Sequence, residues 1–196
     1  MRGRCWVGSV SAVAAAVLVL AGPAGAEFKG ALLTPPKAAH ELALTTLDGK
    51  SFRLSRERGN VVALWFGYTF CPDVCPATLA ELIQVQTRLG AAARRFRIVF
   101  VTVDPERDTP ARLRAYLDAF GGTVTALTGT PERLAEARKA YGVVAEKRVI
   151  PGTSAAYLID HSAFVYVVDP AGQLRLMFPF GMAVEDMVHD IKQLLQ

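Results

Sequence analysis

Two cysteines four residues apart are the side chains of this sequence best suited to chemistry. Cys71 and Cys75 lie in FGYTFCPDVCP, and each is followed by a proline. A thiolate attacks disulfides and also binds soft metal ions. The pair is therefore a redox dithiol, part of a metal site, a short disulfide or two structural thiols. A stabilising disulfide is disfavoured because the loop that it would close is tiny.

The cysteines are predicted to lie at the turn between a buried strand and a helix. The preceding run VVALWF is apolar throughout, as in a strand covered on both faces. A helix is expected from Pro76 to Leu89, where Gly90 ends it. A helix N-terminus carries roughly half a positive charge, which favours thiolate over thiol. The position therefore indicates reactive cysteines, without choosing between redox and metal chemistry.

A metal held by two thiolates needs at least one more donor, and the sequence offers three histidines. His189 lies beside apolar positions of the last expected helix, as is typical of a boundary residue. His40 lies where an N-terminal leader meets the first expected hairpin. His161 stands in DHSA directly before the strand FVYVV, and in thioredoxin-like folds a residue at this place faces the cysteine turn. His161 is the best candidate ligand, although a hydrogen-bonded histidine at a strand end fits the residues equally well.

The donor set of two cysteines and one histidine favours copper. Thiolates and imidazole suit both copper and zinc, but structural zinc normally takes four protein ligands and no fourth is evident. Two thiolates and a neutral imidazole form a low-coordinate site for Cu(I). Cu(II) could use the same donors with an added water. Because an accessible dithiol reduces Cu(II), such a site suits transfer of the ion better than permanent storage.

The elements that must position these residues form an α/β pattern. ELALTTLDGKSFRL alternates polar and apolar residues around Asp48-Gly49, which predicts an N-terminal β-hairpin. Residues 142–157 lack a clear period and are expected to form a surface loop. Further strands are expected at RIVFVTV, VTALTG, FVYVV and QLRLMF, and further helices over 109–120, 130–141 and 184–195. This order predicts a mixed central sheet flanked by helices.

Composition and charge indicate one globular domain outside the nucleic-acid-binding class. The chain has 196 residues, of which 52% are hydrophobic and 20% charged, so it can bury a sizeable core. Its net charge of +4 is spread along the chain, and no block of five or six like charges occurs. Binding to nucleic acid therefore has little support.

The N-terminus predicts export from the cytoplasm. Arg2 and Arg4 precede an apolar stretch, and Ala24-Gly25-Ala26 offers the small residues of a cleavage site. Residues 1–26 are thus a signal peptide or an uncleaved N-terminal anchor. Residues 27–39 are expected to be a flexible leader and residues 40–196 the folded domain. We expect a periplasmic or otherwise extracytoplasmic monomer, soluble after cleavage or tethered to the inner membrane.

Four stretches together resemble the Sco/SenC family of copper-binding, thioredoxin-like proteins. They are FGYTFCPDVCPATLAEL, VFVTVDPERDTPARLRAYL, ALTGTPERL and DHSAFVYVVDPAGQL. The resemblance implies copper ligation by Cys71, Cys75 and His161 in a thioredoxin-like fold. It also implies a role in assembling the binuclear copper centre of cytochrome c oxidase subunit II. Phe70 departs from the pattern, since many members have histidine there, but that histidine is not a family ligand.

Two functions follow from the resemblance and the dithiol. The first is a metallochaperone that receives copper from an extracytoplasmic donor and passes it to subunit II. The second is a thiol–disulfide oxidoreductase that reduces the copper-ligand cysteines of that subunit, in which Cys71 attacks and Cys75 resolves the mixed disulfide. A peroxidase is poorly supported, because Thr69 stands two residues before Cys71 whereas peroxiredoxins place this threonine three before.

Three further side chains are expected near the cysteines. Asp73 lies between them, and Asp104 follows the next strand in VDPERD. Their carboxylates could tune the thiolates or bind a partner, but turn and capping chemistry explains acidic residues at such places as well. Tyr68 is expected either to line the site or to pack in the core.

Overall fold

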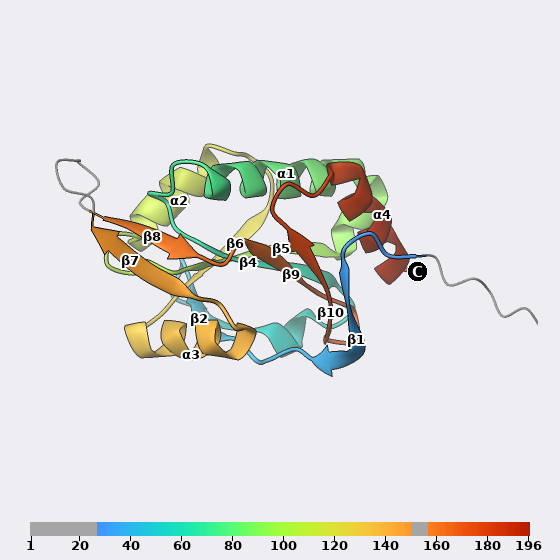
Figure 1. Ribbon diagram of the computed structural model, residues 1–196, viewed down its shortest axis with the longest axis horizontal. Helices are drawn as coiled ribbons and strands as arrows, with labels where there is room; N and C mark the ends of the chain where they lie inside the picture. The colour runs from blue at the N-terminus through green and yellow to red at the C-terminus, as the bar shows by residue number, and fades with distance from the viewer. Residues whose placement is uncertain (1–26, 150–156) are drawn as a thin grey trace, which may run out of the picture.

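The computed structural model describes residues 27–149 and 157–196 (Figure 1). The predicted signal peptide or anchor, residues 1–26, lies outside them. No helix in the described ranges is long and apolar enough to cross a membrane. The strands are β1 (Ala31–Ala38), β2 (Ala43–Thr46), β3 (Ser51–Arg53), β4 (Val61–Gly67), β5 (Phe96–Thr102), β6 (Val124–Thr128), β7 (Ala145–Val149), β8 (Tyr157–His161), β9 (Phe164–Val168) and β10 (Gln173–Pro179). The helices are α1 (Val74–Arg88), α2 (Pro110–Asp118), α3 (Pro131–Tyr141) and α4 (Val184–Leu194), with short 3-10 helices η1 (Leu54–Glu57) and η2 (Gly90–Arg95).

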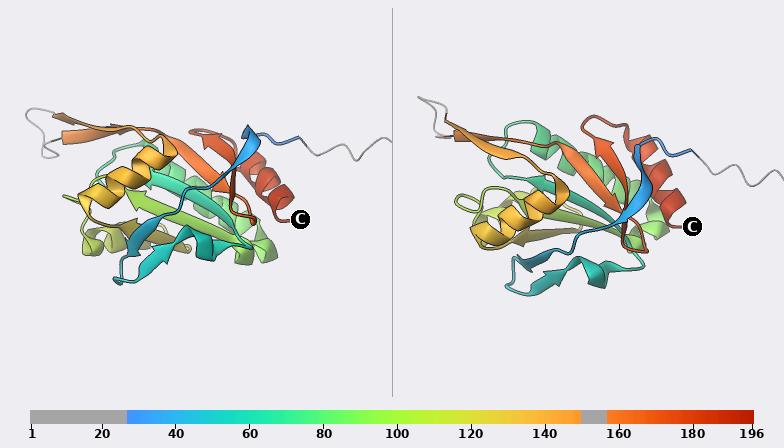
Figure 2. Two further views of the ribbon diagram at one scale, coloured as in Figure 1. Left: turned by 90° about the horizontal axis from the view of Figure 1, so that it is seen from below. Right: turned by 60° about the horizontal axis from the view of Figure 1, so that its bottom comes forward.

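A mixed eight-stranded sheet forms the centre of the molecule, as the strand pattern predicted. Its order is β1-β10-β9-β4-β5-β6-β2-β3. Strands β4, β5 and β6 run parallel, whereas β9, β10, β1 and the β2–β3 hairpin pair antiparallel. Helices α1, α2 and α4 lie on one face and α3 on the other (Figures 1 and 2). Both faces of the central strands are therefore shielded from water.

Strand β4 is the centre of the core and leads directly into the cysteine turn. All seven of its residues are buried, because helices cover both of its faces. Its last residue, Gly67, has no room for a side chain: a Cβ there would lie 2.8 Å from the Trp65 ring and 2.9 Å from the Phe100 ring. These two aromatic rings pack with their centroids 5.0 Å apart. The strand end that precedes the cysteines is thus held rigidly.

The predicted helices and hairpins are confirmed, with ends shifted by at most two residues. The Thr109 hydroxyl accepts the Arg112 backbone N–H, and the Thr130 hydroxyl accepts the Arg133 N–H, so both threonines cap their helices. Helix α1 begins at Val74 rather than Pro76. Its first turn therefore includes the second cysteine.

The flexible leader expected over residues 27–39 differs from the structure. Residues 31–38 form β1, an edge strand that pairs with β10 and shifts register between Leu32 and Lys37. The side chains of β1 are almost all exposed, so no hydrophobic alternation marks the strand in the sequence. Prolines are compatible with an edge strand at a bulge, which accommodates Pro35-Pro36. The folded domain therefore begins before the expected boundary at residue 40.

The surface loop expected over residues 142–157 also differs from the structure. Strands β7 and β8 form a separate antiparallel hairpin in which Ala145 pairs with His161. The hairpin projects from the body at the left of Figure 1. Four of the five side chains of β7 are exposed, and the strand is recognisable only by its backbone pairing. The sequence AEKRV therefore gave no apolar signal for it.

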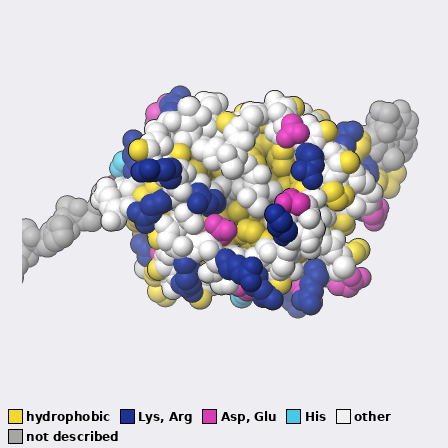
Figure 3. Space-filling view, turned by 180° about the vertical axis from the view of Figure 1, so that it is seen from behind, with side chains coloured by type: hydrophobic (Ala, Val, Ile, Leu, Met, Phe, Trp, Pro, Cys, Tyr) yellow, Lys and Arg dark blue, Asp and Glu magenta, His cyan; other side chains and the backbone are white. Residues whose placement is uncertain are grey.

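The surface mixes charges of both signs with apolar side chains. Seen from behind, Lys and Arg side chains lie at several separate places among acidic and hydrophobic ones (Figure 3). The larger exposed apolar side chains include Phe164 and Phe180, next to the paired ends of β9 and β10.

A buried carboxylate in α4 fastens the segment that precedes β1. Asp190 is fully buried, and its oxygens accept the backbone N–H groups of Lys29 at 2.9 Å and Gly30 at 2.7 Å. The contact joins residues 160 positions apart. Asp190 therefore ties the segment that leads into β1 to the last helix of the domain.

Replacement of Asp190 by Ala should lower the free energy of unfolding by about 3 kcal/mol. Hydrogen bonds to a charged group are worth about 1.5–3 kcal/mol, and two backbone donors lose theirs together. Urea unfolding followed by circular dichroism measures the change. The control is Glu136→Ala, which removes an exposed carboxylate paired with Arg133 and should cost less than about 0.5 kcal/mol. Equal losses in the two variants would contradict the anchoring role.

Candidate metal centre

The β4–α1 turn brings the two cysteines together. Cys71 is half-buried in the turn, and Cys75 is fully buried in the first turn of α1. The backbone N–H of Cys75 donates to the Cys71 sulfur at 3.4 Å. Both thiols are free. The helix N-terminus thus faces the more exposed sulfur, as the sequence indicated.

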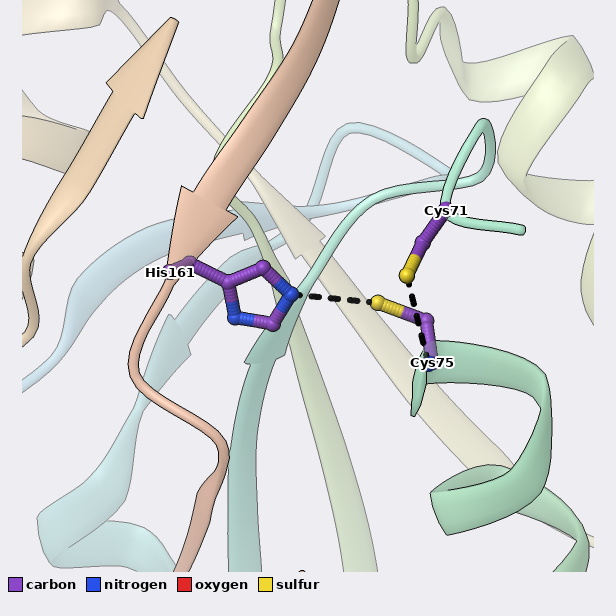
Figure 4. A group of neighbouring side chains, drawn as sticks. All are labelled: Cys71, Cys75 and His161. Carbon is purple, nitrogen blue, oxygen red and sulfur yellow. Dashed lines mark hydrogen bonds between the residues drawn. The ribbon is translucent and has the colours of Figure 1, made fainter. Parts of the chain in front are cut away.

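His161 reaches the cysteines from the end of β8 (Figure 4). Its Nε2 lies 3.3 Å from the Cys75 sulfur. Its Nδ1 lies 3.0 Å from the carbonyl oxygen of Ser162, which can only accept a hydrogen bond, so Nδ1 carries the proton of the neutral ring. The Nε2 lone pair therefore points to the sulfurs, which is the tautomer that a metal ion needs.

The donor atoms of Cys71, Cys75 and His161 all lie within 4.8 Å of one another. In the described part of the chain, no other group of three or more His, Cys, Asp or Glu residues has this geometry. His40 instead packs its ring edge against Tyr141. In the folded chain, His161 therefore lies with the cysteines and His40 does not.

His189, the remaining candidate, lies away from the cysteines. Its Nδ1 is 3.0 Å from the carboxylate of Asp190 in α4. The two histidines that sequence position disfavoured are therefore engaged elsewhere.

The two thiols have opposite acidities. The pKa of Cys71 falls to about 4, chiefly because its thiolate accepts a hydrogen bond from the Cys75 thiol and also from backbone N–H groups, while burial acts in the opposite direction. Burial raises the pKa of Cys75 far above its ordinary range, and the neighbouring Cys71 thiolate raises it further. At neutral pH the pair therefore carries one negative charge, on Cys71.

A cavity of about 290 Å³ opens beside the cysteine turn. Its lining includes Tyr68, Cys71, Asp73, Ile159 and His161. The Tyr68 hydroxyl accepts the Ile159 backbone N–H at 3.1 Å, so Tyr68 both lines the site and supports β8. The expectations that Tyr68 and Asp73 lie near the cysteines are confirmed.

Asp104 lies at the edge of the site rather than in the cavity. Its carboxylate accepts the Tyr157 hydroxyl at 2.8 Å and forms an ion pair with Arg107 at 2.5 Å. Sequence reasoning did not single out Arg107 and Tyr157. The only signal for Arg107 was its place in the charged stretch DPERD, and Tyr157 lay at the end of the expected loop.

The donor set suits a soft, low-coordinate metal ion. Two sulfurs and one imidazole nitrogen are the donors that copper prefers among those that proteins offer. Structural zinc normally requires a fourth protein ligand, and none joins the cluster within the described residues. The arrangement therefore fits Cu(I) directly and leaves room on the cavity side for a further ligand.

Comparison with known proteins agrees with this geometry. A family model described as SCO1/SenC matches residues 32–196. The chain belongs to the SCO1/SenC family. The match spans the sheet, the cysteine turn and the histidine hairpin, so the family resemblance of the four motifs is confirmed.

Solved structures show the same fold. The copper-bound ScoI of Bradyrhizobium japonicum is 34% identical with a TM-score of 0.72, over 80% of this chain and 99% of that one. The apo Sco1 of Thermus thermophilus is 38% identical with a TM-score of 0.77, over 89% and 100%. A thiol:disulfide interchange protein of the thioredoxin family from Chlorobium tepidum is 22% identical with a TM-score of 0.58, over 82% and 97%, which shows the fold alone. The SCO1/SenC fold of this chain is thus thioredoxin-like, as predicted.

The lowered pKa of Cys71 predicts an unusual pH dependence of alkylation. The rate of modification of the reduced protein by iodoacetamide should stay nearly constant from about pH 8 to about pH 6, because Cys71 remains a thiolate, whereas an ordinary cysteine of pKa about 8.5 slows tenfold per unit. Mass spectrometry after tryptic digestion identifies the modified residue. Cys71→Ser should abolish the fast reaction, and Cys75→Ser should retain it because the hydroxyl still donates to Cys71. A tenfold loss of rate per pH unit in this range would contradict the assignment.

Proposed function

We propose that this protein is an extracytoplasmic copper metallochaperone that holds one copper ion between Cys71, Cys75 and His161. The observation that carries the proposal is the convergence of the three donor atoms within 4.8 Å in a chain of the SCO1/SenC family. The copper-bound ScoI of Bradyrhizobium japonicum supports copper as the metal. The ion is cargo, received from one protein and passed to another.

The unequal exposure of the ligands suits transfer of the ion. Cys75 is fully buried, whereas Cys71 is half-buried and lines the cavity with His161. A ligand of an acceptor protein can therefore approach the copper ion through the cavity. Replacing the ligands one at a time avoids release of free copper, because each new bond forms before an old one is lost.

The proposed acceptor is subunit II of cytochrome c oxidase, whose binuclear copper centre needs a supply of the ion. The Sco family has been described as one of cytochrome c oxidase assembly proteins, which supports an oxidase as the target. The predicted signal peptide or anchor supports a location outside the cytoplasm, where a second protein would donate the copper.

Anaerobic titration with Cu(I) tests the proposed site. Reduced residues 27–196 should bind one tight equivalent in competition with a Cu(I) chelator. His161→Ala should weaken binding by about tenfold or more, since loss of even an outer-shell partner costs 10–100-fold. The Cys71→Ser/Cys75→Ser double variant should abolish tight binding.

The matched control is His40→Ala, which removes a histidine that packs on Tyr141 away from the cysteines. It should leave the affinity for Cu(I) unchanged. Weak binding by the unaltered protein, or binding that ignores His161, would overturn the three-ligand site.

A second function, thiol–disulfide exchange, is favoured by the opposite acidities of the cysteines. The Cys71 thiolate would attack one sulfur of a partner disulfide, form a mixed disulfide and release the other sulfur as a thiolate. Cys75 would then lose its proton, attack the Cys71 sulfur and release the second partner thiolate. Two electrons pass from the dithiol to the partner, which could be the oxidised copper-ligand cysteines of subunit II.

Trapping of the mixed disulfide tests this second function. The Cys75→Ser variant, mixed with a peptide that contains the oxidised cysteine pair of subunit II, should accumulate a covalent adduct through Cys71, because the resolving thiol is absent. The Cys71→Ser variant should form little adduct, since Cys75 is buried and protonated. Non-reducing electrophoresis measures both products. Equal adducts from the two variants would exclude the assigned order of attack.

A further inference from the structure

The two halves of the candidate copper site belong to different parts of the fold. Cys71 and Cys75 follow the rigid strand β4, whereas His161 ends β8 in a hairpin that is not hydrogen-bonded into the eight-stranded sheet. Because only two residues connect His161 to β9, its distance from the sulfurs depends on this connection and on the side chains that fasten the hairpin to the body.

Arg107 is a partly buried charged side chain that contacts both halves. It lies between β5 and α2, with 16% of its side chain exposed, and its guanidinium stacks over the Tyr157 ring at 3.6 Å and the Phe70 ring at 4.6 Å. Phe70 directly precedes Cys71, and Tyr157 begins β8. A single planar group thus lies between the cysteine turn and the histidine strand.

Hydrogen bonds fix the orientation of this stack. Arg107 donates to the Tyr157 carbonyl oxygen at 2.8 Å and pairs with the Asp104 carboxylate at 2.5 Å. The other oxygen of Asp104 accepts the Tyr157 hydroxyl at 2.8 Å. Because the Asp104 side chain is fully buried, this ion pair is shielded from the solvent that weakens exposed pairs.

We propose that Arg107 is a positioning residue that sets the separation of His161 from Cys71 and Cys75 and thereby tunes copper affinity. The inference rests on the proposed function and adds a residue that does not touch the metal. A guanidinium stacks on aromatic rings and donates in fixed directions, which lysine cannot reproduce. Loss of the stack should let the hairpin move while the cysteine pair stays in place.

The hairpin has other contacts, of which the hydrogen bond between Tyr68 and Ile159 also joins the two halves. Lys147 pairs with Glu106 at 2.6 Å, but both side chains are largely exposed, and such pairs contribute little. Tyr68 holds the Ile159 backbone N–H from the cysteine side. Arg107 differs because its stacking partners lie on both the cysteine turn and β8.

A double-mutant cycle between Arg107→Lys and His161→Ala tests the proposal. In the otherwise unaltered protein, Arg107→Lys should weaken Cu(I) binding about 10–100-fold, as loss of an outer-shell partner does. With His161→Ala already present, the same change should alter affinity by no more than about twofold, the usual scatter of additivity. The Cys71–Cys75 pair of Arg107→Lys should still form a disulfide, since neither Arg107 nor His161 takes part in the bond between the two sulfurs.

Two further variants make the test selective. Arg112→Lys is the matched control, because Arg112 stacks on the same Phe70 ring at 4.3 Å and donates to Thr69, both on the cysteine side. Arg112→Lys should weaken Cu(I) binding much less than Arg107→Lys does. Tyr157→Leu removes the ring on the hairpin side and should weaken Cu(I) binding as Arg107→Lys does. Circular dichroism verifies that each variant is folded.

The outcomes separate this inference from the proposed function. Failure of the unaltered protein to bind Cu(I) would reject the copper site itself. Tight binding that His161→Ala weakens and Arg107→Lys does not would reject only the positioning role. An equal loss from Arg107→Lys with and without His161, or an equal loss from Arg112→Lys, would also reject it.

Discussion

Three electron-rich donor atoms within 4.8 Å of one another repel unless a proton or a metal ion lies between them, and this constraint organises the site. In the metal-free molecule, protons satisfy it. The Nδ1–H of His161 donates a hydrogen bond to the Ser162 carbonyl oxygen, so Nε2 faces Cys75 as an acceptor. Cys75 keeps its proton and Cys71 loses one, which leaves a single negative charge among the three donors. Since a metal ion must displace the remaining proton, affinity for copper is coupled to pH.

The fold builds the site from two parts, the cysteine turn after the rigid strand β4 and the separate β7–β8 hairpin. The sulfurs follow β4, which is buried along its whole length and ends at a glycine with no space for a side chain. The imidazole stands on a two-stranded hairpin outside the main sheet. No β-ladder joins the two parts, so side-chain contacts help to set the distance between His161 and the cysteine sulfurs. The proposed transfer of the ion would benefit from this division, because this distance can change without unfolding the core.

The sequence predicts those helices and strands whose apolar side chains are buried in a regular pattern. β4 was visible as an unbroken apolar run, because burial on both faces leaves its signal in neighbouring residues. β1 and β7 were missed since their side chains are exposed and only their backbones pair. The ligand set illustrates the same limit. Spacing marked the cysteines as reactive and chain position favoured His161 over His40 and His189, but only tertiary contacts bring its Nε2 to 3.3 Å from the Cys75 sulfur.

The two proposed functions, copper transfer and disulfide exchange, would compete for the same atoms. Both require Cys75 to give up the proton that burial makes it retain. In copper binding the charge of the ion drives this loss, and in disulfide exchange the new sulfur–sulfur bond does. An oxidised pair has no thiolate for copper, so the two functions belong to alternating states of one dithiol. His161 distinguishes them, because a ligand near the buried sulfur stabilises the copper state and takes no part in the bond between the two sulfurs.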